Sequence, residues 1–179
     1  RFRRPSGKAA REALRGAAER IVATRHGAIA VADSGGDRPA LLLIHGNSSA
    51  KEAFAAQFRA FKDRYRVISY DLPGHGVSDN ADPDRDYSVE AFADVAEDVL
   101  AALGVSKPFV FGWSLGGYIA IELAARGYPI AALSISGTPP LRLVPEDVGK
   151  AYDATSHLVL ASKRVLSPAE RRGLATSTT

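Results

Sequence analysis

The sequence predicts an α/β protein with a mostly parallel sheet and helices on both faces, and two patterns carry this prediction. Apolar runs that end at Gly or Pro, at residues 40–46 and 66–76, are typical of strands buried on both faces. Residues 108–113 and 130–136 are also predicted to be strands. Runs with helical spacing separate them, at residues 51–61, 88–104 and 115–126. Strands that alternate with helices in this way favour parallel pairing, because each helix returns the chain to the start of the next strand.

The first elements after the basic N-terminus also have local signals. Residues 26–36 alternate between apolar and small or polar positions and end in a Gly pair, which indicates an edge strand or hairpin arm. In residues 51–61, Phe54, Phe58 and Phe61 follow at spacings of four and three, which places them on one helical face.

The helix predicted over residues 88–104 has signals at both ends. Ser88 is expected as its N-cap, Glu90 suits the positive end of the helix dipole, and Gly104 suits its C-terminal stop. Its apolar stripe consists of Phe92, Val95, Val99, Leu100 and Leu103.

Composition excludes several classes of protein. The 179 residues are 46% hydrophobic and 24% charged, and no apolar run approaches the roughly 20 residues that span a bilayer. The chain has no Cys, so disulfides and thiolate metal sites are excluded, and a cytoplasmic location is expected. The net charge of +3 conceals a first 20 residues at +5 and a remainder at −2, so the basic character is not that of a nucleic-acid-binding face. Residues 1–25 are predicted to be a basic extension.

Residues 112–116, Gly-Trp-Ser-Leu-Gly, fit the pattern G-x-S-x-G between a predicted strand and a predicted helix. A nucleophilic Ser in this context lies on a very sharp turn, where a Cβ two residues to either side would collide with the adjoining elements. The turn lifts the hydroxyl above the sheet edge and directs a helix N-terminus at the reacting oxygen. The pattern therefore predicts Ser114 as a nucleophile; the alternative is a Gly-rich turn with a capping Ser.

The segment His45-Gly46-Asn47 follows the first buried strand. A turn at this place can present a backbone N–H to a substrate oxyanion, and the residue after the nucleophile presents the second. Asn47 and Leu115 are therefore the predicted oxyanion-hole donors. His45 is predicted to be structural, an imidazole that ties down the loop.

Two other His residues are weighed as catalytic groups and set aside. Asp71 and His75 are four residues apart, but the Pro-Gly turn between them provides no helical face, so a rigid loop that lines the site is predicted instead. His157 lies in a predicted helix before any further strand, a poor position for a general base to Ser114.

The segments IHGNSS (44–49), YDLPGHGVSD (70–79), FGWSLGG (111–117) and SGTPP (136–140) together resemble the α/β-hydrolase family. Within it, the likeness is to bacterial N-acyl-homoserine lactonases, on the segments 45–49, 82–88, 110–117, 136–140 and 146–152. Tyr118 departs from this group, which has His at that place. The resemblance implies acyl transfer to Ser114, an ester or lactone as substrate, and no metal or organic cofactor. Gly46, Trp113 and Tyr118 are expected to line the substrate site.

The resemblance also implies that the chain is incomplete. It predicts an α/β-hydrolase core over residues 26–140 and the start of a helical cap over 141–179, without the last two strands, the catalytic acid and the catalytic His. The position after the strand 130–136, where some members place the acid, holds Gly137 and Thr138. A general carboxylesterase and a non-catalytic fragment or pseudo-enzyme are therefore alternatives. No nucleic-acid or membrane partner is expected, and the oligomeric state is left open.

Overall fold

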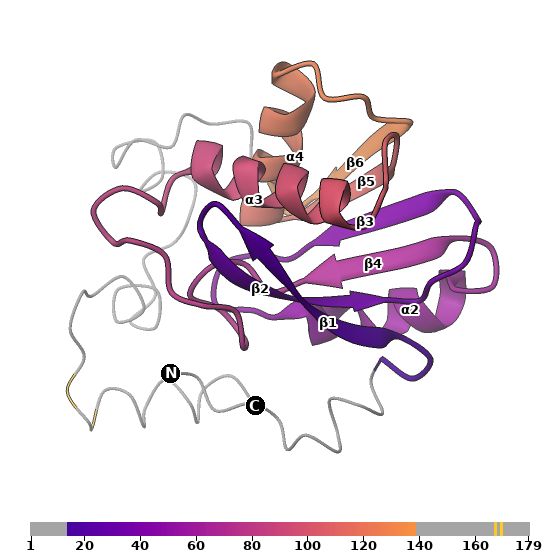
Figure 1. The fold of residues 1–179 in the computed structure, drawn as a ribbon, viewed down its shortest axis with the longest axis horizontal. Coiled ribbons are helices and arrows are strands. Elements are labelled where there is room, and N and C mark those ends of the chain that lie inside the picture. The colour runs from indigo at the N-terminus through magenta and orange to yellow at the C-terminus, as the bar shows by residue number, and fades with distance from the viewer. Residues whose placement is uncertain (1–13, 139–166, 168, 170–179) are drawn as a thin grey trace. The chain divides into compact units, whose positions relative to one another are not determined.

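The computed structural model describes residues 14–138, 167 and 169, and the chain divides into two compact units between Thr138 and Pro139. The first unit holds a twisted sheet with helices on both faces (Figure 1). The predicted cap, residues 141–179, lies outside the described residues apart from 167 and 169. None of the described helices is long and apolar enough to cross a membrane.

The described strands form one six-stranded sheet in the order β1-β2-β4-β3-β5-β6. Their bounds are β1 Ala18–Thr24, β2 Gly27–Asp33, β3 Ala40–Ile44, β4 Arg66–Tyr70, β5 Phe109–Trp113 and β6 Ala132–Ser136. β2 pairs antiparallel with both β1 and β4, while β4, β3, β5 and β6 are mutually parallel. The predicted mostly parallel sheet is confirmed.

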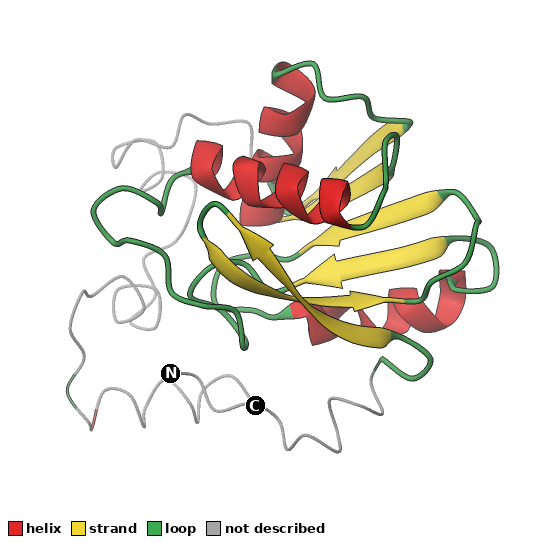
Figure 2. Ribbon diagram, in the orientation of Figure 1, coloured by secondary structure: helices red, strands yellow, loops and turns green. Residues whose placement is uncertain are grey.

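Helices cover the sheet from both sides, as Figure 2 shows in red and yellow. They are the 3-10 helix η1 (Lys51–Phe54) followed by α2 (Ala55–Phe61), then α3 (Val89–Ala102) and α4 (Leu115–Ala125). α3 and α4 pack in the larger hydrophobic cluster, and η1 and α2 in the smaller one.

The continuous apolar run of β3 contributes side chains to both hydrophobic clusters. Leu42 and Ile44 belong to the larger cluster, and Leu43 between them belongs to the smaller one. All three side chains are at most 1% exposed. Since successive strand residues point to opposite faces, a strand covered on both sides has to be apolar throughout.

α3 follows its predicted signals closely. The Ser88 hydroxyl accepts a hydrogen bond from the Ala91 N–H at 3.1 Å, which caps the helix. Gly104 has φ +67° just beyond its C-terminus. Glu90 lies in the first turn, where its own backbone N–H and the Ser88 hydroxyl lower its pKa. The five residues of the predicted stripe are all buried.

The structure corrects one predicted boundary and adds detail to one predicted helical face. β1 lies within the segment 1–25 that was predicted to be an extension, so the predicted boundary at residue 26 comes too late. Only Val22 of this strand is buried, and backbone pairing with β2 holds the rest. Of the three Phe residues that were placed on one helical face, Phe54 in η1 and Phe58 in α2 are buried, whereas Phe61 is 37% exposed and packs edge-to-face against Tyr65.

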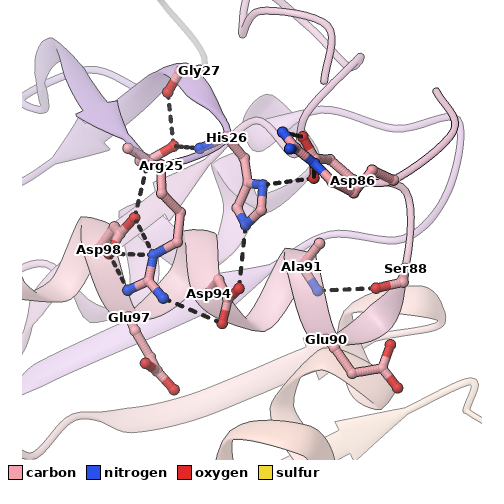
Figure 3. Close-up of polar contacts among 12 residues, drawn as sticks. Arg25, His26, Gly27, Asp86, Ser88, Glu90, Ala91, Asp94, Glu97 and Asp98 are labelled. Carbon is pink, nitrogen blue, oxygen red and sulfur yellow. Dashed lines mark hydrogen bonds and ion pairs between the residues drawn. The ribbon is translucent and has the colours of Figure 1, made fainter. Parts of the chain in front are cut away.

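A polar cluster ties the β1–β2 turn to α3 (Figure 3). The His26 ring lies between two carboxylates, with Nδ1 3.2 Å from Asp86 and Nε2 3.2 Å from Asp94. The Arg25 guanidinium donates to Asp98 at 2.7 Å. Burial alone would raise the pKa of Asp98, but these Arg25 bonds outweigh burial and lower it. The cluster anchors the outermost strand pair to the body of the domain.

A buried ion pair joins the two loops that leave β3 and β4. The Lys51 ammonium is 3.0 Å from Asp71 and 2.9 Å from Glu52, and the side chains of Lys51 and Asp71 are 4% and 0% exposed. Burial alone would lower the pKa of Lys51, but the two carboxylates outweigh burial and raise it. Asp71 also accepts the backbone N–H groups of Lys51 and Val77. The carboxylate therefore fixes both loops to one point.

Removal of this carboxylate should destabilise the protein far more than removal of an exposed one. We expect Asp71→Ala to lower the free energy of unfolding by about 3–5 kcal/mol, because it leaves a buried ammonium with one partner fewer. The control Asp98→Ala breaks the exposed pair with Arg25, whose side chain is 52% exposed; it should lose less than about 1 kcal/mol. Urea unfolding measures both, and equal losses would contradict the assignment.

Candidate active site

Ser114 occupies a strained turn between β5 and α4. Its backbone has φ +54° and ψ −118°, a conformation that residues with a Cβ rarely adopt. Its N–H donates to Ser136 O at 2.8 Å, and its carbonyl accepts from the Gly117 N–H at 2.9 Å. The sharp strand-to-helix turn that the G-x-S-x-G pattern predicts is confirmed.

The two flanking Gly residues are required by close backbone contacts. A Cβ on Gly112 would overlap the backbone of Gly116 and Gly117. A Cβ on Gly116 would overlap the Ile44 carbonyl and lie 2.8 Å from His45 O. Gly116 is thus required mainly by the carboxyl end of β3, against which the first turn of α4 is packed.

The loop after β3 lies directly against the Ser114 turn. A Cβ on Gly46 would be 2.9 Å from Ser114 Cβ and 3.4 Å from its Oγ. Asn47 follows Gly46 in this loop, and Leu115 follows Ser114 as the first residue of α4. Within the described residues, neither backbone N–H is hydrogen-bonded to another group. Of the other predicted lining residues, Trp113 is 41% exposed and Tyr118 lies half-buried in α4.

His45 is fully buried and has the contacts of a structural imidazole. Its Nδ1 donates to Gly46 O at 2.7 Å, and its Nε2 accepts the Leu72 N–H at 3.0 Å. This pattern requires the neutral ring with the proton on Nδ1. Burial lowers the pKa of His45 to about 4, against a smaller raising effect of the Gly46 carbonyl.

Asp71 and His75 are not paired with each other, as the sequence predicts. Asp71 binds Lys51, whereas His75 Nδ1 donates to Pro73 O at 3.0 Å. His75 Nε2 accepts the Ser48 N–H at 3.1 Å. Burial lowers the pKa of His75, which favours this neutral form. His75 therefore holds the loop that carries Asn47, at a point where Ser48 has φ +57°.

Two contributors to the site escape sequence reasoning. Lys51 lies on a predicted amphipathic helix, and only the tertiary fold brings it to Asp71. Thr138 follows β6, and its hydroxyl donates to Ser114 O at 2.9 Å. The segment SGTPP was the available signal for Thr138, but nothing in its pattern indicates a contact 24 residues away. The predicted helix with His157 lies outside the described residues, so its position relative to Ser114 is not described.

No group of three or more His, Cys, Asp or Glu in the described part of the chain could hold a metal ion. Both ring nitrogens of His45 and of His75 have other hydrogen-bond partners among the described residues. In the described part of the chain, the site therefore has Ser114 on its strained turn, with the loop after β3 packed against it.

Comparison with known proteins agrees with this fold. The family model for the alpha/beta hydrolase fold matches residues 39–154. The chain therefore belongs to the α/β-hydrolase family.

Similar proteins cover the chain to different extents. The structure of N-acyl homoserine lactonase AidH complexed with N-butanoyl homoserine is 43% identical, with TM-score 0.78, over 90% of this chain and 59% of that one. Epoxide hydrolase 4 of Mus musculus is 37% identical over 51% of this chain and 25% of its own length. An uncharacterised protein of Mycobacterium tuberculosis is 39% identical over 50% of this chain and 26% of its own. The matches thus span about a quarter of these curated relatives.

Gly116→Ala should reverse the usual sign of a helical Gly-to-Ala change. In a free helix, Ala is favoured by about 1 kcal/mol. Here the new Cβ meets the backbone of Ile44 and His45, so we expect a loss of roughly 1–3 kcal/mol or more. Gly127→Ala is the matched control, because it adds a Cβ where nothing lies within 4 Å and only φ +77° opposes it. Thermal unfolding compares the two; a stabilised Gly116→Ala variant would contradict the packing described.

His45 should remain neutral down to acidic pH. Its pKa is about 4 in the folded state against an ordinary 6.5, so unfolding takes up a proton between these values. The free energy of unfolding should fall as the pH drops through this window, by at most ~1.4 kcal/mol per pH unit. An NMR titration of the assigned ring proton checks this, and a midpoint near the ordinary value would contradict the neutral assignment. His45→Gln should flatten the slope.

Proposed function

We propose that this chain carries the nucleophile and oxyanion hole of a serine hydrolase that cleaves a carboxylic ester or lactone, with an N-acyl homoserine lactone as substrate. Ser114 is the nucleophile, and the backbone N–H groups of Asn47 and Leu115 are the oxyanion donors. The main support is the approach of Gly46 to within contact of the strained Ser114 turn. This approach is the reason to propose one donor from the loop after β3 and one from the start of α4.

In the proposed reaction, Ser114 Oγ attacks the lactone carbonyl and loses its proton to a general base. The Oγ–C bond forms, and the carbonyl oxygen becomes an anion held by the two N–H groups. Collapse breaks the ring C–O bond, and the alkoxide takes up a proton. Water then hydrolyses the acyl-enzyme and regenerates the serine. The N-terminal end of α4 adds a favourable dipole at the developing charge.

Chemistry at a serine favours an acyl substrate over an epoxide, although epoxide hydrolases are among the similar proteins. A serine oxygen that opens an epoxide forms an ether, and water does not cleave an ether under mild conditions. The same oxygen acylated by an ester or lactone forms an ester, which water does cleave. Only the second intermediate allows turnover.

The choice of lactone rests on similarity to AidH, which covers most of this chain at 43% identity. That structure holds N-butanoyl homoserine, and its counterpart of equal identity holds N-hexanoyl homoserine. Gly46, Trp113 and Tyr118 are proposed to line the pocket for the acyl group. Tyr118 is one position at which the chain departs from the lactonases it resembles.

The proposal is tested with protein from the complete reading frame. Hydrolysis of N-hexanoyl homoserine lactone, an aryl ester and styrene oxide is measured for the unaltered protein and for Ser114→Ala. We expect turnover of the lactone and the ester, no multiple turnover of the epoxide, and a loss of about 10⁴-fold or more in kcat for Ser114→Ala. Mass spectrometry of a quenched reaction should locate an acyl group on Ser114.

The control variant is Ser106→Ala, an exposed serine on the α3–β5 connection that should retain full activity. Turnover of the ester without turnover of the lactone would contradict the lactone as substrate and would indicate a general carboxylesterase. No turnover of any of the three, or turnover that survives Ser114→Ala, would overturn the assignment of the nucleophile.

A further inference from the structure

We propose that Thr138 is a positioning residue of the oxyanion hole, because its hydroxyl fixes the peptide plane that presents the Leu115 N–H. The inference rests on the proposed function. Thr138 acts through the Ser114 carbonyl and does not itself reach the reacting atoms.

The contact lies where the chain leaves β6. Thr138 Oγ1 is 2.9 Å from Ser114 O, and 3.3 Å from Ser136 O. Ser114 O also accepts the Gly117 N–H at 2.9 Å, so this carbonyl has two donors. A Cβ on Gly117 would overlap the Thr138 hydroxyl, so Gly117 leaves the room that the contact needs.

The geometry of the peptide bond carries the effect to the site. Ser114 C=O and Leu115 N–H belong to one planar trans peptide, in which the two groups point in opposite directions. A carbonyl held on the side of β6 therefore directs the N–H to the opposite side. A hydrogen bond to the carbonyl also polarises the peptide, which strengthens its N–H as a donor.

The second predicted donor is held in the same manner from another element. Gly46 C=O accepts the His45 Nδ1–H at 2.7 Å, and this carbonyl shares its peptide plane with the Asn47 N–H. His45 is itself fixed by the Leu72 N–H. Each donor peptide thus has its carbonyl bound by a side chain, Thr138 for one and His45 for the other. This recurrence supports a role in orientation, since packing alone requires no hydroxyl at residue 138.

The strained backbone of Ser114 gives a reason for the hydrogen bond from Thr138. Its φ of +54° is strained, and a strained residue keeps its conformation only when its surroundings over-determine it. Ser136 O accepts the Ser114 N–H, and the Thr138 hydroxyl donates to the Ser114 carbonyl. Two residues of one short segment therefore hold the turn by both polar groups of its backbone. Loss of the hydroxyl leaves only the Gly117 bond on the carbonyl side.

The test compares Thr138→Val, which keeps the shape without the hydroxyl, with Thr138→Ser, which keeps the hydroxyl. In protein from the complete reading frame, Thr138→Val should lower kcat for the lactone roughly 10-fold or more, with KM within about twofold, because the donors act on the transition state. Thr138→Ser should restore kcat to within about threefold. Affinity for a trifluoromethyl ketone, which forms an anionic tetrahedral adduct, should fall in parallel with kcat.

Thr24→Val is the matched control, because the Thr24 hydroxyl donates to Gly27 O at 2.7 Å in the β1–β2 turn, far along the sheet from Ser114. It should lower the melting temperature without any change in kcat. If Thr138→Val does not fold, Thr138→Ala replaces it with the same expectation.

Full activity in Thr138→Val or Thr138→Ala would overturn the inference and leave the proposed function standing. A kcat loss that Thr138→Ser does not repair, or an unchanged affinity for the ketone, would show that residue 138 acts only in packing. Hydrolysis that is absent in the unaltered protein, or independent of Ser114, would instead remove the proposed function and the inference with it.

Discussion

The close approach between the Ser114 turn and the carboxyl end of β3 is the contact on which the rest of the site depends. Gly116 lies against the Ile44 and His45 carbonyls, and Gly46 lies against Ser114 itself. Parallel pairing of β3 with β5 brings the carboxyl ends of the two strands to the same end of the sheet. Helices on both faces of the sheet bury much of these strands. Every group assigned to the proposed chemistry is a backbone or side-chain neighbour of this contact.

Buried polar side chains turn this contact into a fixed arrangement. Asp71 binds both loops through Lys51 and Val77, His45 joins the Gly46 carbonyl to Leu72, and His75 holds Ser48. These groups are neutral or paired, so burial does not leave an uncompensated charge. The residues that resemble a catalytic Asp–His set in the sequence therefore act as the frame of the loop, and the proposed chemistry falls to the serine and to backbone N–H groups.

Local patterns in the sequence predict much of this domain. The buried strands β3 and β4, the caps of α3 and the turn at Ser114 all follow from residues next to one another, where spacing and Gly placement are direct signals. β1 could not be recognised because Val22 is its only buried residue and its strand form comes from pairing with β2. The Lys51–Asp71 pair and the Thr138 contact join residues 20 and 24 positions apart, so they depend on the tertiary fold.

A crystal structure of the protein from the complete reading frame, with a phosphonate bound to Ser114, tests the central claim most directly. The phosphoryl oxygen stands for the oxyanion, and its distances to the Asn47 and Leu115 nitrogens are the quantities to measure. The arrangement described predicts that both are about 2.7–3.1 Å. An adduct whose oxygen points away from both nitrogens, or a phosphonate that binds elsewhere and leaves Ser114 unmodified, would contradict it.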